Sequence, residues 1–213
     1  MNGPEKLPSD VVARLVGKPK RKQGERYGHV TYKGEYSYAG ATYRINSAKS
    51  GCHTLILQRI IEQTTAMLAV YRRVLFVRVD LHHRQPEPTN QRLSAFLKSA
   101  RDRAQRYYRT QHVGYLWVRE QDKANSQHYH LILMVDGDKV AYPARLLDSL
   151  KEIWERLGGT LSIPCSSYIF IDSPERVTDA VYRASYLAKA RGKGYRPDGV
   201  RDFDCSRLKL PPV

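Results

Sequence analysis

The sequence predicts an α+β fold, a split βαβ arrangement with a central antiparallel sheet and flanking helices. Two observations lead to this prediction. Apolar residues switch repeatedly between helical spacing and strand alternation, and two strand-like runs are separated only by the short polar segment QDKANSQ. The resulting order is helix, strand, helix, strand, strand, helix, strand, helix, which indicates one mixed domain built around a hairpin.

Four helices and four strands are expected along the chain. The helices show apolar residues three and four apart, and the strands are rich in β-branched and aromatic residues. The last helix begins with Ser173 at its N-cap and Pro174 at its first position, and glycine follows its expected end. The predicted helices are 53–71, 91–109, 143–159 and 173–194, and the predicted strands are 73–83, 113–120, 128–135 and 167–172.

The charge of the chain is strongly positive and uneven. Its 213 residues include 36 Lys and Arg against 21 Asp and Glu, a formal net charge of +15, which favours a polyanion such as nucleic acid as partner. Residues 1–50 hold ten basic and four acidic side chains, and residues 181–213 hold eight and three. We therefore expect a basic N-terminal extension over residues 1–50, a main domain over 51–195, and a basic irregular tail over 196–213.

The extension contains tyrosines between its basic residues and is expected to form a short β-ribbon near residues 28–45. Such a mixture suits phosphates and stacked bases, and a solvated tail is the alternative. Cys52, Cys165 and Cys205 lie far apart with no CxxC spacing, which argues against a disulfide scaffold or a zinc ribbon. No apolar run approaches the roughly 20 residues of a membrane span, and the start MNGPEKLPSD is unlike a signal peptide. A cytoplasmic protein with no membrane partner is expected.

Two histidines, His128 and His130, lie one residue apart in a strand-like run. Side chains alternate across a strand, so both imidazoles point to one face and Tyr129 points to the other. If the preceding turn centres near Asn125, Glu120 faces His130 across the hairpin. Two imidazoles and one carboxylate leave open positions on a divalent ion, as catalytic metal sites do. Mn²⁺ or Mg²⁺ is the expected ion, and histidines satisfied within the core are the alternative.

The segment VYRASYLAK places Tyr182, Tyr186 and Lys189 at intervals of four and three residues. On a helix these three side chains share one face. A tyrosine ionises near pH 10 and is a poor nucleophile unless a cation stabilises its phenolate or a metal ion withdraws charge from the electrophile. Packing and phosphate contact are the alternative for a tyrosine pair on a basic helix.

The strand motif HYH, followed about fifty residues later by YLAK on a helix, resembles the HUH endonuclease superfamily. These proteins are the rolling-circle replication initiators of phages and plasmids, with related relaxases and transposases, and the similarity is greatest to inovirus-type replication endonucleases. The resemblance covers about residues 70–195 and implies a ferredoxin-like palm with the metal on the central sheet. It assigns Glu120, His128 and His130 as metal ligands, Tyr186 as nucleophile, Lys189 as its helper and Tyr182 as the other tyrosine of a two-tyrosine form.

The implied activity is nicking and rejoining of single-stranded or hairpin DNA at a replication origin, through a covalent 5′-phosphotyrosine. The sequence has no GxxxxGK[ST] motif, so unwinding is left to a partner helicase. The alternatives are a non-catalytic DNA- or RNA-binding regulator and a two-histidine phosphoesterase. That second class usually has another His-x-Thr/Ser motif, and this chain offers only HTL at 53–55. The residues expected to contact DNA are Lys20, Arg21, Lys22, Arg44, Lys49, Arg183, Arg191 and Lys193.

Overall fold

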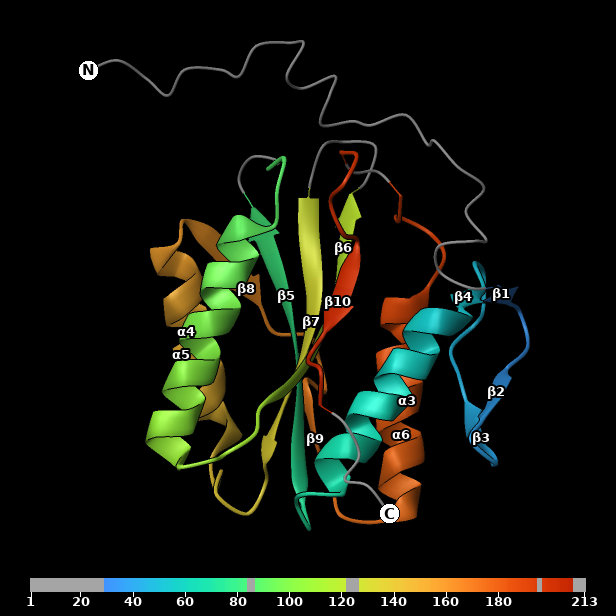
Figure 1. The fold of residues 1–213 in the computed structure, drawn as a ribbon, viewed down its shortest axis with the longest axis horizontal. Helices are drawn as coiled ribbons and strands as arrows, with labels where there is room; N and C mark the ends of the chain where they lie inside the picture. Colours follow the sequence, from blue (N-terminus) through green and yellow to red (C-terminus); the bar gives the residue numbers. More distant parts are fainter. Residues whose placement is uncertain (1–28, 84–86, 122–126, 195–196, 209–213) are drawn as a thin grey trace.

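The computed structural model describes residues 29–83, 87–121, 127–194 and 197–208. An antiparallel sheet lies at its centre (Figure 1). Its strands are β5 (Val74–His83), β6 (Gly114–Gln121), β7 (Gln127–Asp136), β8 (Gly159–Ser162), β9 (Tyr168–Ile171) and β10 (Phe203–Cys205). The strand order is β10–β6–β7–β5, and the free edge of β5 pairs with β8 along one half and with β9 along the other.

Two helices cover each face of this sheet. α4 (Gln91–Tyr108) and α5 (Pro143–Arg156) pack on one face, and α3 (Thr54–Leu68) and α6 (Pro174–Ala184) pack on the other (Figure 1). The predicted α+β class, with a central antiparallel sheet and flanking helices, is therefore confirmed. Among the described residues, no helix is both long and apolar enough to cross a membrane.

The central strand β7 is apolar on both faces because both faces are covered. Leu131 and Leu133 are buried under α4 and α5, whereas Ile132 and Met134 are buried under α3 and α6. Period-two alternation places successive side chains on opposite faces. Gln127, His128 and His130 lie at the beginning of the strand and Asp136 lies at its end, so β7 carries two histidines directly into the core layer.

The segment before α3 packs on the domain. β2 (Glu35–Tyr38) and β3 (Ala41–Arg44) form a hairpin, which confirms the ribbon expected near 28–45. Its turn places Ala39 at φ +50° and Gly40 at φ +80°, as a two-residue hairpin turn requires. β1 (Val30–Thr31) pairs with β4 (Cys52–His53), and β3 contacts α6.

The last helix is shorter than the sequence predicted. α6 ends at Ala184 and is followed by a 3₁₀ turn, η1 (Ser185–Ala188), so a helix continuing to residue 194 is wrong. The Ser185 hydroxyl donates to the Tyr182 carbonyl at 2.6 Å and accepts from the Asn46 backbone N–H at 2.8 Å. Lys189 then adopts an extended ψ of 135° and forms a bridge with Cys52. Contacts with the N-terminal segment therefore end the helix early.

Two described strands of the central sheet were not predicted. β8 has only four residues and begins at a glycine, so it carries too short an alternation to be recognised. β10 lies in the tail expected to be irregular, and it pairs with β6 along the edge of the sheet. Helix α5 stops at Arg156 and not at the predicted residue 159, because Gly158 just after it adopts a positive φ of +80°.

Candidate active site

The β6–β7 hairpin brings Glu120, His128 and His130 together on one face of the sheet. The register pairs Glu120 with His128 and Val118 with His130, so the predicted pairing of Glu120 with His130 is wrong by two residues. A polar turn such as QDKANSQ offers no signal that fixes its centre to one residue. A two-residue shift preserves the face on which every side chain lies. The carboxylate therefore stays on the histidine face.

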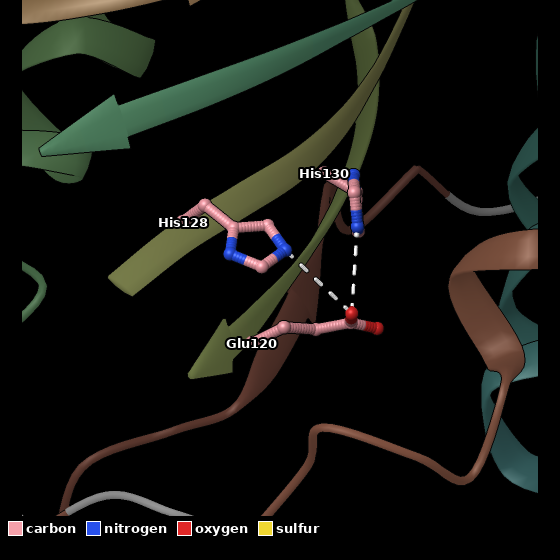
Figure 2. Close-up of side chains that lie close together, drawn as sticks. All are labelled: Glu120, His128 and His130. Atoms are coloured by element: carbon pink, nitrogen blue, oxygen red, sulfur yellow. Dashed lines mark ion pairs between the residues drawn. The ribbon is translucent and has the colours of Figure 1, made fainter. Parts of the chain in front are cut away.

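The three side chains converge from two adjacent strands, and Figure 2 shows them pointing toward one another. Their potential ligand atoms all lie within 4.8 Å of one another. Oε2 of Glu120 is 3.7 Å from Nε2 of His128 and 3.5 Å from Nε2 of His130. Glu120 and His130 are buried, and His128 is partly buried. The group could therefore hold one metal ion.

A buried nitrogen of His130 tests this fit. Its Nε2 atom is inaccessible to solvent and has no hydrogen-bond partner among the described residues. Burying such an atom without a partner is costly, and a cation between the imidazoles and Glu120 would satisfy it. Two nitrogen ligands and one carboxylate suit a divalent ion with open coordination positions.

Asp80 fixes the orientation of His130. Strand β5 places Asp80 opposite His130, and Oδ1 of Asp80 lies 2.6 Å from Nδ1 of the imidazole. This contact favours a proton on Nδ1 and leaves the Nε2 lone pair directed at Glu120. Arg78 holds Asp80 in turn, with Nη2 3.2 Å from Oδ2. Sequence reasoning missed Asp80, although a carboxylate within the apolar run VLFVRVDL was a usable signal.

Lys193 lies behind Glu120. Its buried ammonium group donates to Oε1 of Glu120 at 2.6 Å, which leaves Oε2 facing the histidines. Gly192 adopts φ +73°, and a Cβ atom there would stand 3.2 Å from Oε2 of Glu120. The backbone therefore approaches the carboxylate closely at a position that favours glycine. Lys193 was expected to contact DNA, and the structure places its amino group inside the protein.

The electrostatics of the site follow from these contacts. Burial alone would raise the pKa of Glu120, but the imidazoles of His128 and His130 and the charge of Lys193 hold it well below its usual range. Burial disfavours a charged His130, yet the carboxylates of Asp80 and Glu120 outweigh it and raise the imidazole pKa. The site therefore concentrates negative charge around His130.

Tyr186 lies beside the ligand group. The 3₁₀ turn η1 brings its ring to 5.4 Å from the ring of His130, edge to face. The guanidinium carbon of Arg78 lies 4.4 Å from the centre of the Tyr186 ring, and Nη2 of Arg191 donates to its hydroxyl at 3.2 Å. Two arginines therefore contact the phenol, one over its ring and one at its oxygen.

Tyr182 and Lys189 make other contacts than with the candidate metal ligands. Tyr182 is 40% exposed, and the guanidinium carbon of Arg44 lies 5.3 Å from the centre of its ring. Lys189 is buried, and its ammonium group donates to Oδ1 of Asn46 at 2.9 Å and to the carbonyl of Ala48. Because the helix ends at Ala184, the expected common face of the two tyrosines and the lysine does not form.

The other residues expected to contact DNA are distributed around this region. Arg44, Lys49, Arg183 and Arg191 are exposed. Arg183 donates to the carbonyls of Ser166 and Tyr168, at 3.3 Å each. Lys20, Arg21 and Lys22 lie outside the described residues.

Comparison with known proteins gives one family match. The model of the family described as the YagK/YfjJ C-terminal domain matches residues 38–159, more than half of the chain. The matched segment runs from β2 to β8 and includes Asp80 and the three candidate metal ligands, but it ends before Tyr186. No curated protein and no solved structure matches the chain.

Proposed function

The chain belongs to the YagK/YfjJ C-terminal domain family, and we propose that it is a metal-dependent endonuclease that nicks and rejoins single-stranded DNA. The observation that carries this proposal is the contact of Tyr186 with the candidate ligand His130, whose rings are 5.4 Å apart. A phenol and a potential cation site from distant parts of the chain can therefore act on the same phosphate. The order of the motifs, HYH on a strand and then YLAK, resembles HUH endonucleases and points to the same reaction.

Glu120, His128 and His130 would hold the ion, which we propose to be Mn²⁺ or Mg²⁺. When bound, it supplies Lewis-acid polarisation of the scissile phosphate. Asp80 keeps the Nε2 lone pair of His130 available for it. Lys193 occupies the other oxygen of Glu120, so the carboxylate presents a single oxygen to the histidine side.

Tyr186 is the proposed nucleophile. Its oxygen attacks the phosphorus in line, a tyrosyl O–P bond forms, and the bond from phosphorus to the 3′-oxygen breaks. The phenol proton is lost to solvent, and the leaving 3′-oxygen takes up a proton to give a free hydroxyl. Arg191 donates a hydrogen bond to the phenol oxygen and would orient it for the attack. A 3′-hydroxyl reverses the reaction and rejoins the strand, because the covalent link keeps the free energy of the phosphodiester.

The proposed role is initiation of rolling-circle replication in the cytoplasm, with a separate helicase for unwinding. The net charge of +15 suits a DNA partner. Arg44, Lys49, Arg183 and Arg191 are exposed and would contact its phosphates.

The test uses a pool of 3′-labelled single-stranded DNA with varied sequence, incubated with the full chain and Mn²⁺. We expect a labelled adduct that survives denaturation and disappears after protease treatment. Tyr186→Phe and His128→Ala should abolish the adduct, and EDTA should do the same. Tyr142→Phe is the matched control, because Tyr142 is 76% exposed at the start of α5.

Two results would contradict the proposal. An adduct of normal yield with Tyr186→Phe would remove Tyr186 as nucleophile, and an adduct in EDTA would remove the metal requirement. Salt-sensitive binding of DNA with no adduct under any condition would instead favour the non-catalytic regulator.

A further inference from the structure

A cleft of about 250 Å³ lies between β9 and α6, and Tyr186 forms part of its wall. The geometry points to a nucleotide subsite in this cleft that receives one unpaired base next to the scissile phosphate. This inference rests on the proposed nicking function and adds to it the position at which the substrate strand is held. The residues that carry it are Arg78, Tyr168, Tyr182, Arg183 and Tyr186.

The size of the cleft suits one flat ring. Sites for drug-sized ligands usually measure roughly 300–1,000 Å³, so this cleft is somewhat smaller. It accommodates a single base with its sugar and is too small for a duplex. An enzyme acting on paired DNA would need a groove for both strands, whereas this cleft selects an unpaired nucleotide.

Two exposed tyrosines flank the cleft. Tyr168 on β9 is 46% exposed, and Tyr182 on α6 is 40% exposed. Both tyrosines keep a large part of their surface accessible beside the same cleft, so both can contact a ligand bound there. Stacking of a base on such a ring contributes about 1–3 kcal/mol and does not depend strongly on the base.

The polar lining of the cleft is complementary to an anion. Arg78 and Arg183 line it, and no Asp or Glu is among the described residues that do. Arg183 is held in place by hydrogen bonds to the carbonyls of Ser166 and Tyr168. Asn46, Ser166 and Ser167 supply further polar groups. A nucleotide brings both the negative charge and the flat ring that these residues would bind.

The position of Tyr186 links this subsite to the reaction. Its ring contacts the ring of His130, and the same residue lines the cleft. Arg78 also contacts both, because it lines the cleft and binds Asp80 behind His130. A base in the cleft therefore belongs to a nucleotide directly beside the phosphate that Tyr186 attacks.

The subsite also gives Tyr182 a role. As a stacking platform it needs its ring and not its hydroxyl, and Arg44 already lies against that ring. Tyr182→Ala should therefore weaken base-dependent binding of single-stranded DNA, and Tyr182→Phe, which keeps the ring, should restore that binding. Equal loss of base-dependent binding in both variants would show that the hydroxyl is required and would overturn this role.

The binding experiment uses the full chain with Mn²⁺ and carries Tyr186→Phe to prevent cleavage. Short oligothymidylate is compared with an abasic strand of equal length. The dissociation constant of the abasic strand divided by that of oligothymidylate reports the contribution of the bases. Tyr168→Ala and Tyr182→Ala should each lower this ratio about fivefold to a hundredfold. Tyr168→Phe, Tyr182→Phe and the distant control Tyr142→Ala should leave it unchanged.

A ratio that stays unchanged in both alanine variants would overturn the subsite. The same holds if the alanine variants weaken both strands equally, because the cleft would then bind phosphate or only support the fold. Failure of the nicking reaction gives a different pattern. In that case the base-dependent ratio still responds to Tyr168 and Tyr182, while no covalent adduct with Tyr186 forms.

Discussion

Asp80 and His130 face each other on neighbouring strands, with Oδ1 of Asp80 2.6 Å from Nδ1 of His130. The contact sets which ring nitrogen carries the proton, and the other nitrogen faces Glu120 at 3.5 Å. A carboxylate behind a metal-binding histidine orients the ring and strengthens it as a ligand. Asp80 is therefore as much a part of the candidate metal centre as the three ligands.

Asp80→Asn should weaken metal binding about tenfold to a hundredfold. The amide can donate to Nδ1 and shift the proton of His130 to Nε2, the nitrogen that the ion needs. Titration calorimetry with Mn²⁺ measures the change. Asp138→Asn is the control, because Asp138 pairs with Arg72 at the surface. Equal Mn²⁺ affinity in the Asp80 variant and the wild type would exclude the orienting role.

Metal binding should also weaken as the pH falls. The carboxylates of Asp80 and Glu120 raise the pKa of His130, so protons compete with the ion at pH values where an ordinary histidine is already neutral. We expect Mn²⁺ affinity to decline before the pH reaches about 6.5 and one proton to be released on binding. Calorimetry in two buffers of different ionisation enthalpy counts that proton. Binding without proton release near neutral pH would contradict the prediction.

Lys193→Met should destabilise the metal-free protein by about 3–5 kcal/mol, because it leaves the buried charge of Glu120 without its partner. Added Mn²⁺ should restore part of this loss, since a bound cation compensates the same carboxylate. Urea denaturation with and without Mn²⁺ measures both effects. Lys151→Met is the control, because Lys151 forms an exposed pair with Glu155 worth less than about 0.5 kcal/mol. A variant as stable as the wild type without Mn²⁺ would refute this prediction.

Two cations are candidates for activating Tyr186. The resemblance assigns this role to Lys189, whereas the hydrogen bond to the phenol oxygen comes from Arg191. Loss of a charge-assisted hydrogen bond costs about 1.5–3 kcal/mol, so Arg191→Gln should slow adduct formation about tenfold to a hundredfold. Lys189→Gln removes the bonds to Asn46 and Ala48 and should mainly lower the melting temperature. Single-turnover rates per folded molecule separate an effect on the reaction from an effect on stability. A slow Lys189→Gln variant together with a normal Arg191→Gln variant would assign the activating role to Lys189.

Acid should destabilise the fold through His83. Burial lowers its pKa to about 4, and neither ring nitrogen has a hydrogen-bond partner among the described residues. Between about pH 6.5 and about 4 the unfolded chain binds a proton that the folded chain does not, so stability falls as the pH falls. The pKa of His53 is also lowered to about 4 and adds to the effect. His83→Phe should flatten the decline seen in urea midpoints, and an equally steep decline would contradict this.

The sequence was most informative where local periodicity carried the information. Alternation placed His128 and His130 on one face and Tyr129 on the other, and the assumed turn centre added Glu120 to the histidine face. The placement of Glu120 survived an incorrect hairpin register because the error was an even number of residues. Asp80 and Lys193 were not identified as parts of the site, because they reach it across 50 and 73 residues of chain. The carboxylate of Asp80 within an apolar run marked an unusual position, but no local pattern encodes which distant residue it meets.

The region around Tyr186 was harder to predict for a related reason. Helical spacing implied one face for Tyr182, Tyr186 and Lys189, but Ser185 and Lys189 bind the Asn46–Ala48 segment and end the helix. These are tertiary contacts between chain segments about 140 residues apart. Helix propensity in the segment SYLAKAR gave no indication of them.

The division of β5 between two partner strands has a consequence for variation within the family. β8 pairs with one half of β5 and β9 with the other, and residues 163–167 connect them at the cleft beside Tyr186. Insertions or deletions before Ser167 would reshape the cleft wall, while the two ladders keep their alignment on either side. If the proposed nicking function holds, loop length alone would change the DNA sequence preference of related chains, without any change in the reacting groups.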